Sequence, residues 1–169
     1  MKNYILNIVI PTVIFGALFS ALLANAAPNA RAFVERWQPK PDVVNDLAQI
    51  VYYRTQASEI QQAALITVNG KLHAALLPGT YTRVCVKPGR YTLGSSLDLQ
   101  GAQPTTRASF QTTVKPGKTY FVRVNAQDGG KPQPVRRIEA ERDLSGLLLQ
   151  DHVLSRANAV TECRYQSQP

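Results

Sequence analysis

The chain has 169 residues, and its 19 Lys and Arg against 11 Asp and Glu give a formal net charge of +8. This length predicts one domain with its own hydrophobic core rather than two. The positive charge either keeps the protein soluble or favours an anionic surface such as phospholipid headgroups, lipopolysaccharide or acidic glycans. Nucleic acid is not expected as a partner, because no basic run is longer than Arg136-Arg137.

Residues 1–26 have the layout of a cleaved signal peptide, with one lysine, an apolar stretch and the small-residue site Ala24-Asn25-Ala26. The apolar stretch is nearly long enough to span a bilayer, so an uncleaved anchor is the alternative. Asn7 and Pro11 interrupt the stretch, which favours cleavage. No cysteine follows that could accept the acyl chains of a lipoprotein. We expect a mature chain from Ala27 that is periplasmic or associated with the outer membrane.

Residues 27–46 are predicted to form an N-terminal arm. The arm is expected to contain a short helix from Ala30 to Trp37, which Pro39 and Pro41 end. Trp37 is the only tryptophan of the chain. Two interpretations of it stay open: an anchor that enters a partner's pocket, or a side chain that packs onto the protein's own core.

Residues 47–169 are predicted to form the β-sandwich domain. Its first strand, AQIVYYR at 48–54, is rich in residues that suit a pleated, half-buried surface. We expect this strand at an exposed sheet edge, which the arm covers or uncovers when a partner adds a strand. Tyr52 and Tyr53 are therefore candidate partner-binding residues together with Trp37. Packing in the protein's own core is the alternative.

Turn dipeptides divide the following segment into short strands. Asn69-Gly70 suits a two-residue hairpin turn between strands at 64–68 and 71–76. Pro-Gly pairs stand at 78–79, 88–89 and 116–117. Proline presets the first turn dihedral and glycine accepts a positive φ, so we interpret these pairs as hairpin turns. Further strands are predicted at 80–86, 107–114 and 118–124.

The end of the chain contains the predicted helix. VRRIEAERDL at 135–144 fits either a last strand or the start of a helix, and SGLLLQDHVLSR at 145–156 is predicted to be a short helix whose leucines cover one end of the core. Short strands between regularly spaced turns predict a mainly β fold. We expect an antiparallel β-sandwich of about seven or eight strands with a short C-terminal helix.

Cys85 and Cys163 are the only cysteines. In an exported protein, two cysteines far apart in sequence are expected to form one structural disulfide, and two free thiols are the alternative. A metal site would require further ligands at short spacing. The disulfide would tie the C-terminal tail to the central sheet.

Residues that could carry chemistry are few. His73 and His152 lie on different predicted elements, and no serine, cysteine or carboxylate stands beside either in a defined order. We interpret both as solvent-facing or hydrogen-bonded surface histidines. Glu139, Glu141 and Asp143 could share a strand face, but the arginines around them favour an exposed mixed-charge strand. Neither a nucleotide-binding glycine motif nor a metal-ligand spacing such as H-x-x-H or C-x-x-C occurs. Because no assembled site can be named, we expect no enzyme activity, no metal and no cofactor.

Several segments together resemble a known module: IVYYR, VNGK, LLPGTYTRVCVKPGRYTL, VKPGKTYFVRV, and QDHVLSR followed by Cys163. They are similar to the N-terminal β-rich module of certain Gram-negative envelope proteins, over roughly residues 45–165. In that group the module precedes an outer-membrane-protein-A-like peptidoglycan-binding domain. Some members act as accessories to surface adhesins of the trimeric autotransporter class. This chain ends where the second domain would begin, so the resemblance implies nothing about wall anchoring.

The resemblance implies a non-catalytic, periplasmic or outer-membrane-associated module that binds another envelope protein, such as an outer-membrane adhesin. The alternative is a small glycan-binding, ligand-binding or inhibitor-like β-sandwich. In either case, the sheet edges and the strand-end loops are where a partner is expected, because a sandwich leaves its edges unpaired.

Overall fold

The computed structural model describes residues 35–56, 60–97, 108–150, 153 and 155–167. The predicted signal peptide and His152 lie outside these residues. The described residues belong to one compact unit, which spans Phe33–Pro169. They contain no helix that is long and apolar enough to cross a membrane.

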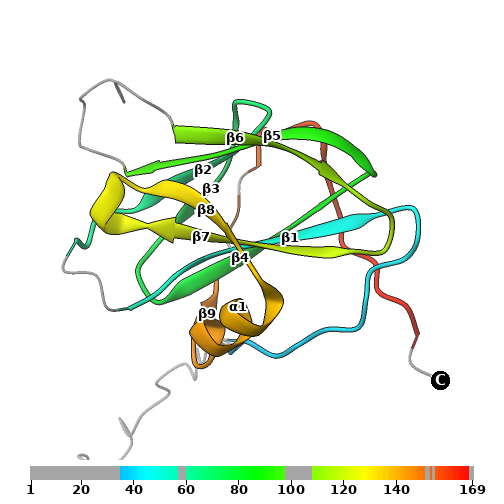
Figure 1. Ribbon diagram of the computed structural model, residues 1–169, viewed down its shortest axis with the longest axis horizontal. Coiled ribbons are helices and arrows are strands. Elements are labelled where there is room, and N and C mark those ends of the chain that lie inside the picture. The colour runs from blue at the N-terminus through cyan, green and yellow to red at the C-terminus, as the bar shows by residue number, and fades with distance from the viewer. Residues whose placement is uncertain (1–34, 57–59, 98–107, 151–152, 154, 168–169) are drawn as a thin grey trace, which may run out of the picture. The chain divides into compact units, whose positions relative to one another are not determined.

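Two β-sheets make up most of the described chain (Figure 1). The first sheet contains β1 (Ala48–Arg54), β4 (Thr80–Val86), β7 (Thr119–Asn125), β8 (Lys131–Val135), β9 (Leu148–Leu149) and β10 (Val160–Thr161). Its order is β10-β4-β1-β7-β8, and β9 also pairs with β4. The second sheet contains β2 (Ala64–Val68), β3 (Lys71–Leu76), β5 (Gly89–Leu97) and β6 (Ala108–Val114), in the order β3-β2-β5-β6.

The predicted mainly β fold with two sheets and one short helix is confirmed. The pairing is antiparallel except between β1 and β7 and between β4 and β9, which run parallel. Most predicted strands agree with the observed ones to within a residue. The Asn69-Gly70 hairpin between β2 and β3 is also confirmed, with φ angles of 51° and 73° that suit a type I′ turn.

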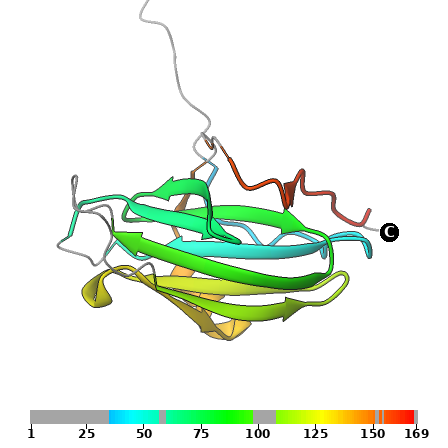
Figure 2. The same cartoon turned by 90° about the horizontal axis from the view of Figure 1, so that it is seen from above.

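The main core lies between the sheets. Its largest members include Ile50, Tyr52, Ile66, Leu76 and Leu93, all at most 1% exposed. The C-terminal segment closes one open side of the sandwich, where Ala157 joins this core. Figure 2 shows this segment, coloured orange to red, along the side of the molecule opposite β8 in yellow.

A second apolar cluster covers the outer face of the first sheet. The helix α1 (Arg137–Leu144) contributes Ala140 and Leu144, which pack with Val51, Tyr53 and Phe121 of the strands. Figure 1 shows α1 beneath this sheet, on the side away from β5 and β6. Both faces of the first sheet are therefore buried.

The position of β1 corrects the prediction of an exposed edge. The strand lies between β4 and β7, and all seven of its residues are buried. A strand that is apolar on both faces suits the middle of a sheet that is covered on both sides, whereas an edge strand usually has one solvated face. The arm therefore does not cover an edge at AQIVYYR.

The Pro-Gly turns are not hairpins. Positions 78–79 connect β3 to β4, positions 88–89 connect β4 to β5, and positions 116–117 connect β6 to β7. Each connection passes from one sheet to the other. Gly79 and Gly117 have the left-handed φ that the sequence predicted, 73° and 66°. The turn chemistry therefore marked where the strands end, but it did not indicate which strands pair.

The C-terminal helix lies earlier than predicted, at 137–144 rather than 145–156. Gly146 has a φ of 83°, a left-handed conformation that does not continue a helix. Leu148 and Leu149 then form β9 against β4. The predicted helix at the start of the arm is also wrong in its described part. Residues 35–37 are extended, because Trp37 N–H donates to Leu147 O (2.8 Å) and Leu149 N–H donates to Glu35 O (2.8 Å).

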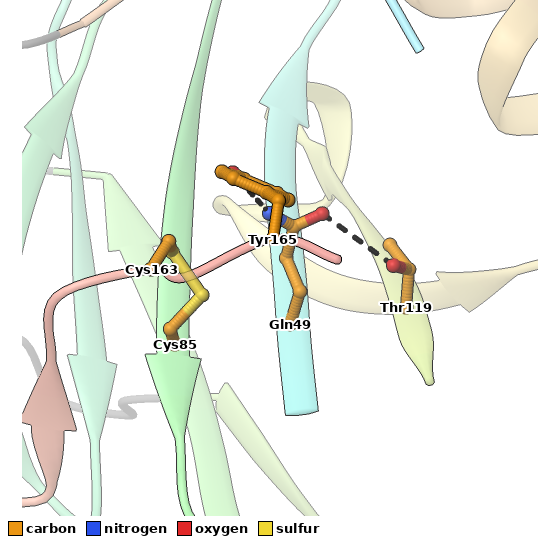
Figure 3. Close-up of a disulfide and its surroundings, with 5 residues drawn as sticks. All are labelled: Gln49, Cys85, Thr119, Cys163 and Tyr165. Atoms are coloured by element: carbon orange, nitrogen blue, oxygen red, sulfur yellow. Dashed lines mark hydrogen bonds between the residues drawn. A yellow bond between two sulfur atoms is a disulfide. The ribbon is translucent and has the colours of Figure 1, made fainter. Parts of the chain in front are cut away.

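The predicted disulfide is present between Cys85 and Cys163, with an S–S distance of 2.02 Å (Figure 3). Next to it, the Gln49 side-chain amide donates to the Tyr165 hydroxyl (2.7 Å), and Thr119 Oγ1 donates to Gln49 Oε1 (3.4 Å). The bridge therefore ties the C-terminal tail to β4, and the hydrogen bonds extend this link across β1 to β7.

Removing the disulfide should lower stability without changing the fold. The cysteines are 78 positions apart. In the chain-entropy account, releasing a loop of that size raises the entropy of the unfolded chain and thereby lowers the unfolding free energy by about 4 kcal/mol. We expect a Cys85→Ala/Cys163→Ala chain to lose about that much unfolding free energy in urea denaturation. The reduced wild-type protein is the control, because it keeps both sulfur atoms and isolates the cross-link. Equal stability of the oxidised and reduced proteins would contradict this prediction.

Candidate functional site

Trp37 packs on the outer face of the first sheet. Its ring lies edge-on to Tyr81 at 5.1 Å and to Phe121 at 6.2 Å, measured between ring centroids. The Arg83 guanidinium carbon stands 5.8 Å from the Trp37 ring. Val43, farther along the arm, is fully buried beside Cys85. Of the two interpretations of Trp37, packing onto the protein's own core is the arrangement found in the structure.

Tyr52 and Tyr53 point to opposite faces of β1, and both are fully buried. Tyr52 lies between the sheets, where its hydroxyl has no hydrogen-bond partner among the described residues. Tyr53 lies under α1 and donates a hydrogen bond to Asp143 Oδ2 (3.0 Å). Burial raises the pKa of both phenols. Neither side chain is accessible to a partner in this fold, so their assignment as partner-binding residues is corrected: β1 is central, and both are core residues.

The three predicted carboxylates lie on α1 rather than on a strand. Glu139 and Asp143 face the first sheet together, because residues four apart share one face of a helix. Arg123 of β7 donates to Glu139 Oε1 (2.8 Å) and Asp143 Oδ2 (3.1 Å). Glu141 pairs with Arg137 at 3.1 Å. Each carboxylate is thus engaged by an arginine, and the two contacts of Arg123 link α1 to the sheet.

His73 lies in the protein interior, with 3% of its surface exposed. Its Nδ1 stands 3.1 Å from Ser155 Oγ, which also accepts the N–H of Ala157 (3.2 Å). Burial lowers the pKa of His73, so the imidazole is neutral at pH 7. The prediction of a hydrogen bond is right, and that of a surface position is wrong. Sequence reasoning missed Ser155 because it stands 82 positions away and comes near only through the fold.

The His73–Ser155 pair links the C-terminal segment to β3. Its other ring nitrogen, Nε2, is buried without a partner among the described residues, and no described carboxylate orients the ring. Nearby, Arg156 N–H donates to Leu72 O of β3 (2.8 Å). Within the part of the chain that the structure describes, no three His, Cys, Asp or Glu side chains gather in a way that could hold a metal ion.

Three of the sheet edges are protected against an added strand. The outer side of β4 pairs with β9 at Thr80–Tyr81 and with β10 at Cys85–Val86. The edge strand β3 accepts the Arg156 N–H described above. The edge strand β8 contains Pro132 and Pro134, which have no N–H to offer an incoming strand.

The fourth edge, β6, has none of these protections. Its sequence ASFQTTV has no charged residue and no proline, and no described strand pairs with its outer side. Asn69 N–H donates to Thr92 O (2.8 Å), so Thr92 faces β2. By the alternation of an antiparallel ladder, the backbone groups of Leu93 face β6, where its pair is Phe110. The N–H and C=O groups of Ser109, Gln111 and Thr113 consequently point to the open edge.

An apolar pocket of about 140 Å³ lies beside this edge, between the two sheets. Phe110 and Thr112 of β6 line it together with Tyr120, Pro134 and Val135 of the facing sheet. The sheets are tied together at the other end of β8, where Leu97 N–H donates to Gly129 O (3.0 Å). Gly130 makes this approach feasible, because a Cβ atom there would lie 2.5 Å from the Leu97 nitrogen. The pocket lies toward the opposite end of β8, next to the turn at 115–118 that connects β6 to β7.

We define the β6 site as the outer edge of β6 together with this pocket. A strand added to β6 would receive backbone hydrogen bonds from three residues and would turn every second side chain toward the pocket. Sequence reasoning missed this site because the edge position of a strand depends on the order of the whole sheet. The local signal was the row of exposed Ser109, Gln111 and Thr113, which alternates with inward residues.

Comparison of the chain with protein-family models, curated proteins and solved structures finds no match.

Tyr52 and Tyr53 offer a matched test of how the two faces of β1 are packed. Tyr52→Phe removes a buried hydroxyl without a described partner, so the unfolding free energy should stay the same or rise by up to about 2 kcal/mol. Tyr53→Phe removes the donor to Asp143, so the unfolding free energy should fall by about 1–2 kcal/mol. Urea denaturation of both variants measures the difference. A clear loss of stability in Tyr52→Phe would reveal a partner for that hydroxyl and contradict the assignment.

Burial of His73 makes stability depend on pH. Its pKa is lowered in the folded protein, so below the unfolded value of about 6.5 the unfolded chain binds more protons than the folded one. Stability should therefore fall as the pH drops below about 6.5, with a slope approaching 1.4 kcal/mol per pH unit. Denaturation between about pH 5 and 7 should show this slope in wild type and in Ser155→Ala, because burial and not the hydrogen bond causes the shift. A His73→Gln chain that kept the same slope would refute this origin.

Proposed function

We propose that the protein is a non-catalytic protein-binding module of the cell envelope, periplasmic or outer-membrane-associated, which binds an extended segment of another envelope protein along β6. The observation that carries the proposal is an uncharged, proline-free strand edge beside an apolar pocket. Natural sheets usually protect such edges with charges, prolines or covering segments, because unpaired backbone groups attract other strands. The remaining edges of this protein are protected in those ways.

The two parts of the β6 site supply different parts of recognition. Backbone hydrogen bonds from Ser109, Gln111 and Thr113 would provide affinity with little dependence on the partner's side chains. The pocket would select the side chains that face inward, and its lining by Phe110, Tyr120 and other apolar groups favours an aliphatic or aromatic residue. The expected partner segment therefore alternates apolar with polar residues.

Two further observations support the cellular context of the proposal. The disulfide between Cys85 and Cys163 suits an oxidising compartment such as the periplasm. The apolar residues 1–26 have the layout of a signal that exports the chain to it. An envelope protein such as an outer-membrane adhesin is the partner that the sequence resemblance implies.

The non-catalytic assignment and the choice of a protein partner rest on the site geometry. Arginines engage the carboxylates of α1, and His73 is buried and neutral. At the β6 site a small-molecule ligand is not favoured, because the pocket there, of about 140 Å³, is smaller than the 300 Å³ or so at which small-molecule sites begin.

Proline substitution on β6 tests the proposal. Gln111→Pro removes one outward N–H, and we expect the protein to remain folded because that N–H has no partner in the sheet. Gln111→Ala is the matched control, because it removes the side chain but keeps the N–H. In pull-downs from envelope extract, wild type and Gln111→Ala should recover the same protein, and Gln111→Pro should recover at least about tenfold less.

Circular dichroism and thermal unfolding establish that each variant is folded before the comparison. If Gln111→Pro does not fold, Thr113→Pro tests the next outward N–H of the same edge. Equal recovery by wild type and a folded proline variant would show that β6 is not the binding edge.

A further inference from the structure

Positive charge is distributed unevenly along this chain. From Ile60 to Gln127 the sequence contains eight Lys and Arg but a single acidic residue, Asp98. This stretch includes all four strands of the second sheet. Two of its arginines, Arg83 and Arg123, lie on the first sheet and form ion pairs there. Within the stretch, only Asp98 could balance the charge of the other Lys and Arg residues.

Four of these cations lie at one end of the sandwich, on the two Lys-Pro-Gly turns: Lys87, Arg90, Lys115 and Lys118. We call this group the basic end. The ladder between β5 and β6 pairs Gly89 with Val114 and Arg90 with Thr113, so the two turns lie side by side. All four side chains are exposed, and none forms an ion pair with a described residue.

The acidic group that the fold brings near the basic end is already neutralised. Asp46 precedes Leu47, whose carbonyl accepts the N–H of Gly117 in the second turn (2.7 Å). The Asp46 carboxylate pairs with Arg164. Glu162 follows Thr161, which pairs with Cys85 of β4. Because β10 runs antiparallel to β4, Glu162 lies farther from the turns than Thr161 does. Among the described residues, no unpaired carboxylate therefore lies close to the basic end.

Hydrogen bonds hold the backbone of both turns in place. The Tyr91 hydroxyl donates to Lys87 O (2.8 Å), and Lys115 N–H donates to the Tyr120 hydroxyl (2.9 Å). Gly117 has a φ of 66°, and a Cβ atom there would stand 2.9 Å from Asn45 Oδ1. The cations are therefore presented from a backbone of defined shape, so binding would order only their side chains.

We propose that the basic end docks the protein on a phosphate-bearing lipid surface. Four exposed cations on two adjacent turns match an array of headgroup phosphates better than one enclosed anion. Each Lys or Arg near an anionic membrane surface contributes attraction without requiring a fitted pocket. The rings of Tyr91 and Tyr120 pack against the main core, so these described aromatic side chains do not form an open stacking platform for nucleic-acid bases. This surface adjoins the β6 site, because Lys115 follows β6 directly and Arg90 pairs with Thr113 of that strand.

Vesicle binding tests the proposal with two variants of equal charge. The first changes Lys87, Arg90, Lys115 and Lys118 to Gln. The second changes four exposed cations elsewhere to Gln, at positions Arg36, Lys131, Arg136 and Arg142. Each variant loses four positive charges, so net charge is matched and only its location differs. Wild type and both variants are purified in the form that the cell exports, and circular dichroism establishes that each is folded. Each protein is then sedimented with vesicles at about 0.15 M salt.

Wild type should bind vesicles of equal parts phosphatidylglycerol and phosphatidylcholine, and should bind pure phosphatidylcholine far less. The basic-end variant should bind the anionic vesicles at least about 100-fold more weakly, since each charge contributes roughly fivefold. The control variant should stay within about tenfold of wild type. Equal losses in the two variants would show an effect of net charge alone and overturn the proposal. So would equal binding to both vesicle types, or equally tight binding to soluble polyglutamate, which would indicate an acidic protein partner.

Discussion

Burial of both faces of the first sheet is the constraint on which the rest of the structure depends. One face packs against the second sheet, and α1 and Trp37 cover the other. This arrangement explains why β1 is central and why Tyr52 and Tyr53 are both inaccessible although they point in opposite directions. It also explains why the arginine and carboxylate network of β7 and α1 is structural. The helix has little apolar surface of its own, and its paired charges help to hold it on the sheet.

The order of strands that follows from this burial also determines which edges remain open. The C-terminal segment is held to β4 by the disulfide and to β3 by the contacts of Ser155 and Arg156, so it closes one side of the sandwich. On the other side, Gly130 lets the two sheets approach each other at one end of β8, and the pocket lies at the other end of this strand. The edge of β6 borders that pocket. The proposed binding site thus lies on the side of the sandwich that the C-terminal segment does not close.

Acidic and basic residues are distributed differently over the two sheets. The acidic residues of α1 and the arm pair with arginines around the first sheet, as Glu35 does with Arg83 and Glu139 with Arg123. The described strands of the second sheet contain no acidic residue, and the turns at one of its ends carry the basic end. The proposed β6 site and the basic end adjoin, because Lys115 follows β6 directly.

Much of the fold could be predicted from local sequence. Asn69-Gly70 determined a hairpin because its φ angles favour that turn, and the β-branched and aromatic runs located most of the strands. The presence of only two cysteines determined the disulfide pair once an oxidising compartment was assumed. Tertiary structure alone decided that the Pro-Gly turns cross between sheets, that β1 is central, that Ser155 meets His73 and that β6 is left open. Turn and strand preferences act over a few neighbouring residues, whereas the pairing of strands depends on which apolar faces from distant segments can be buried together.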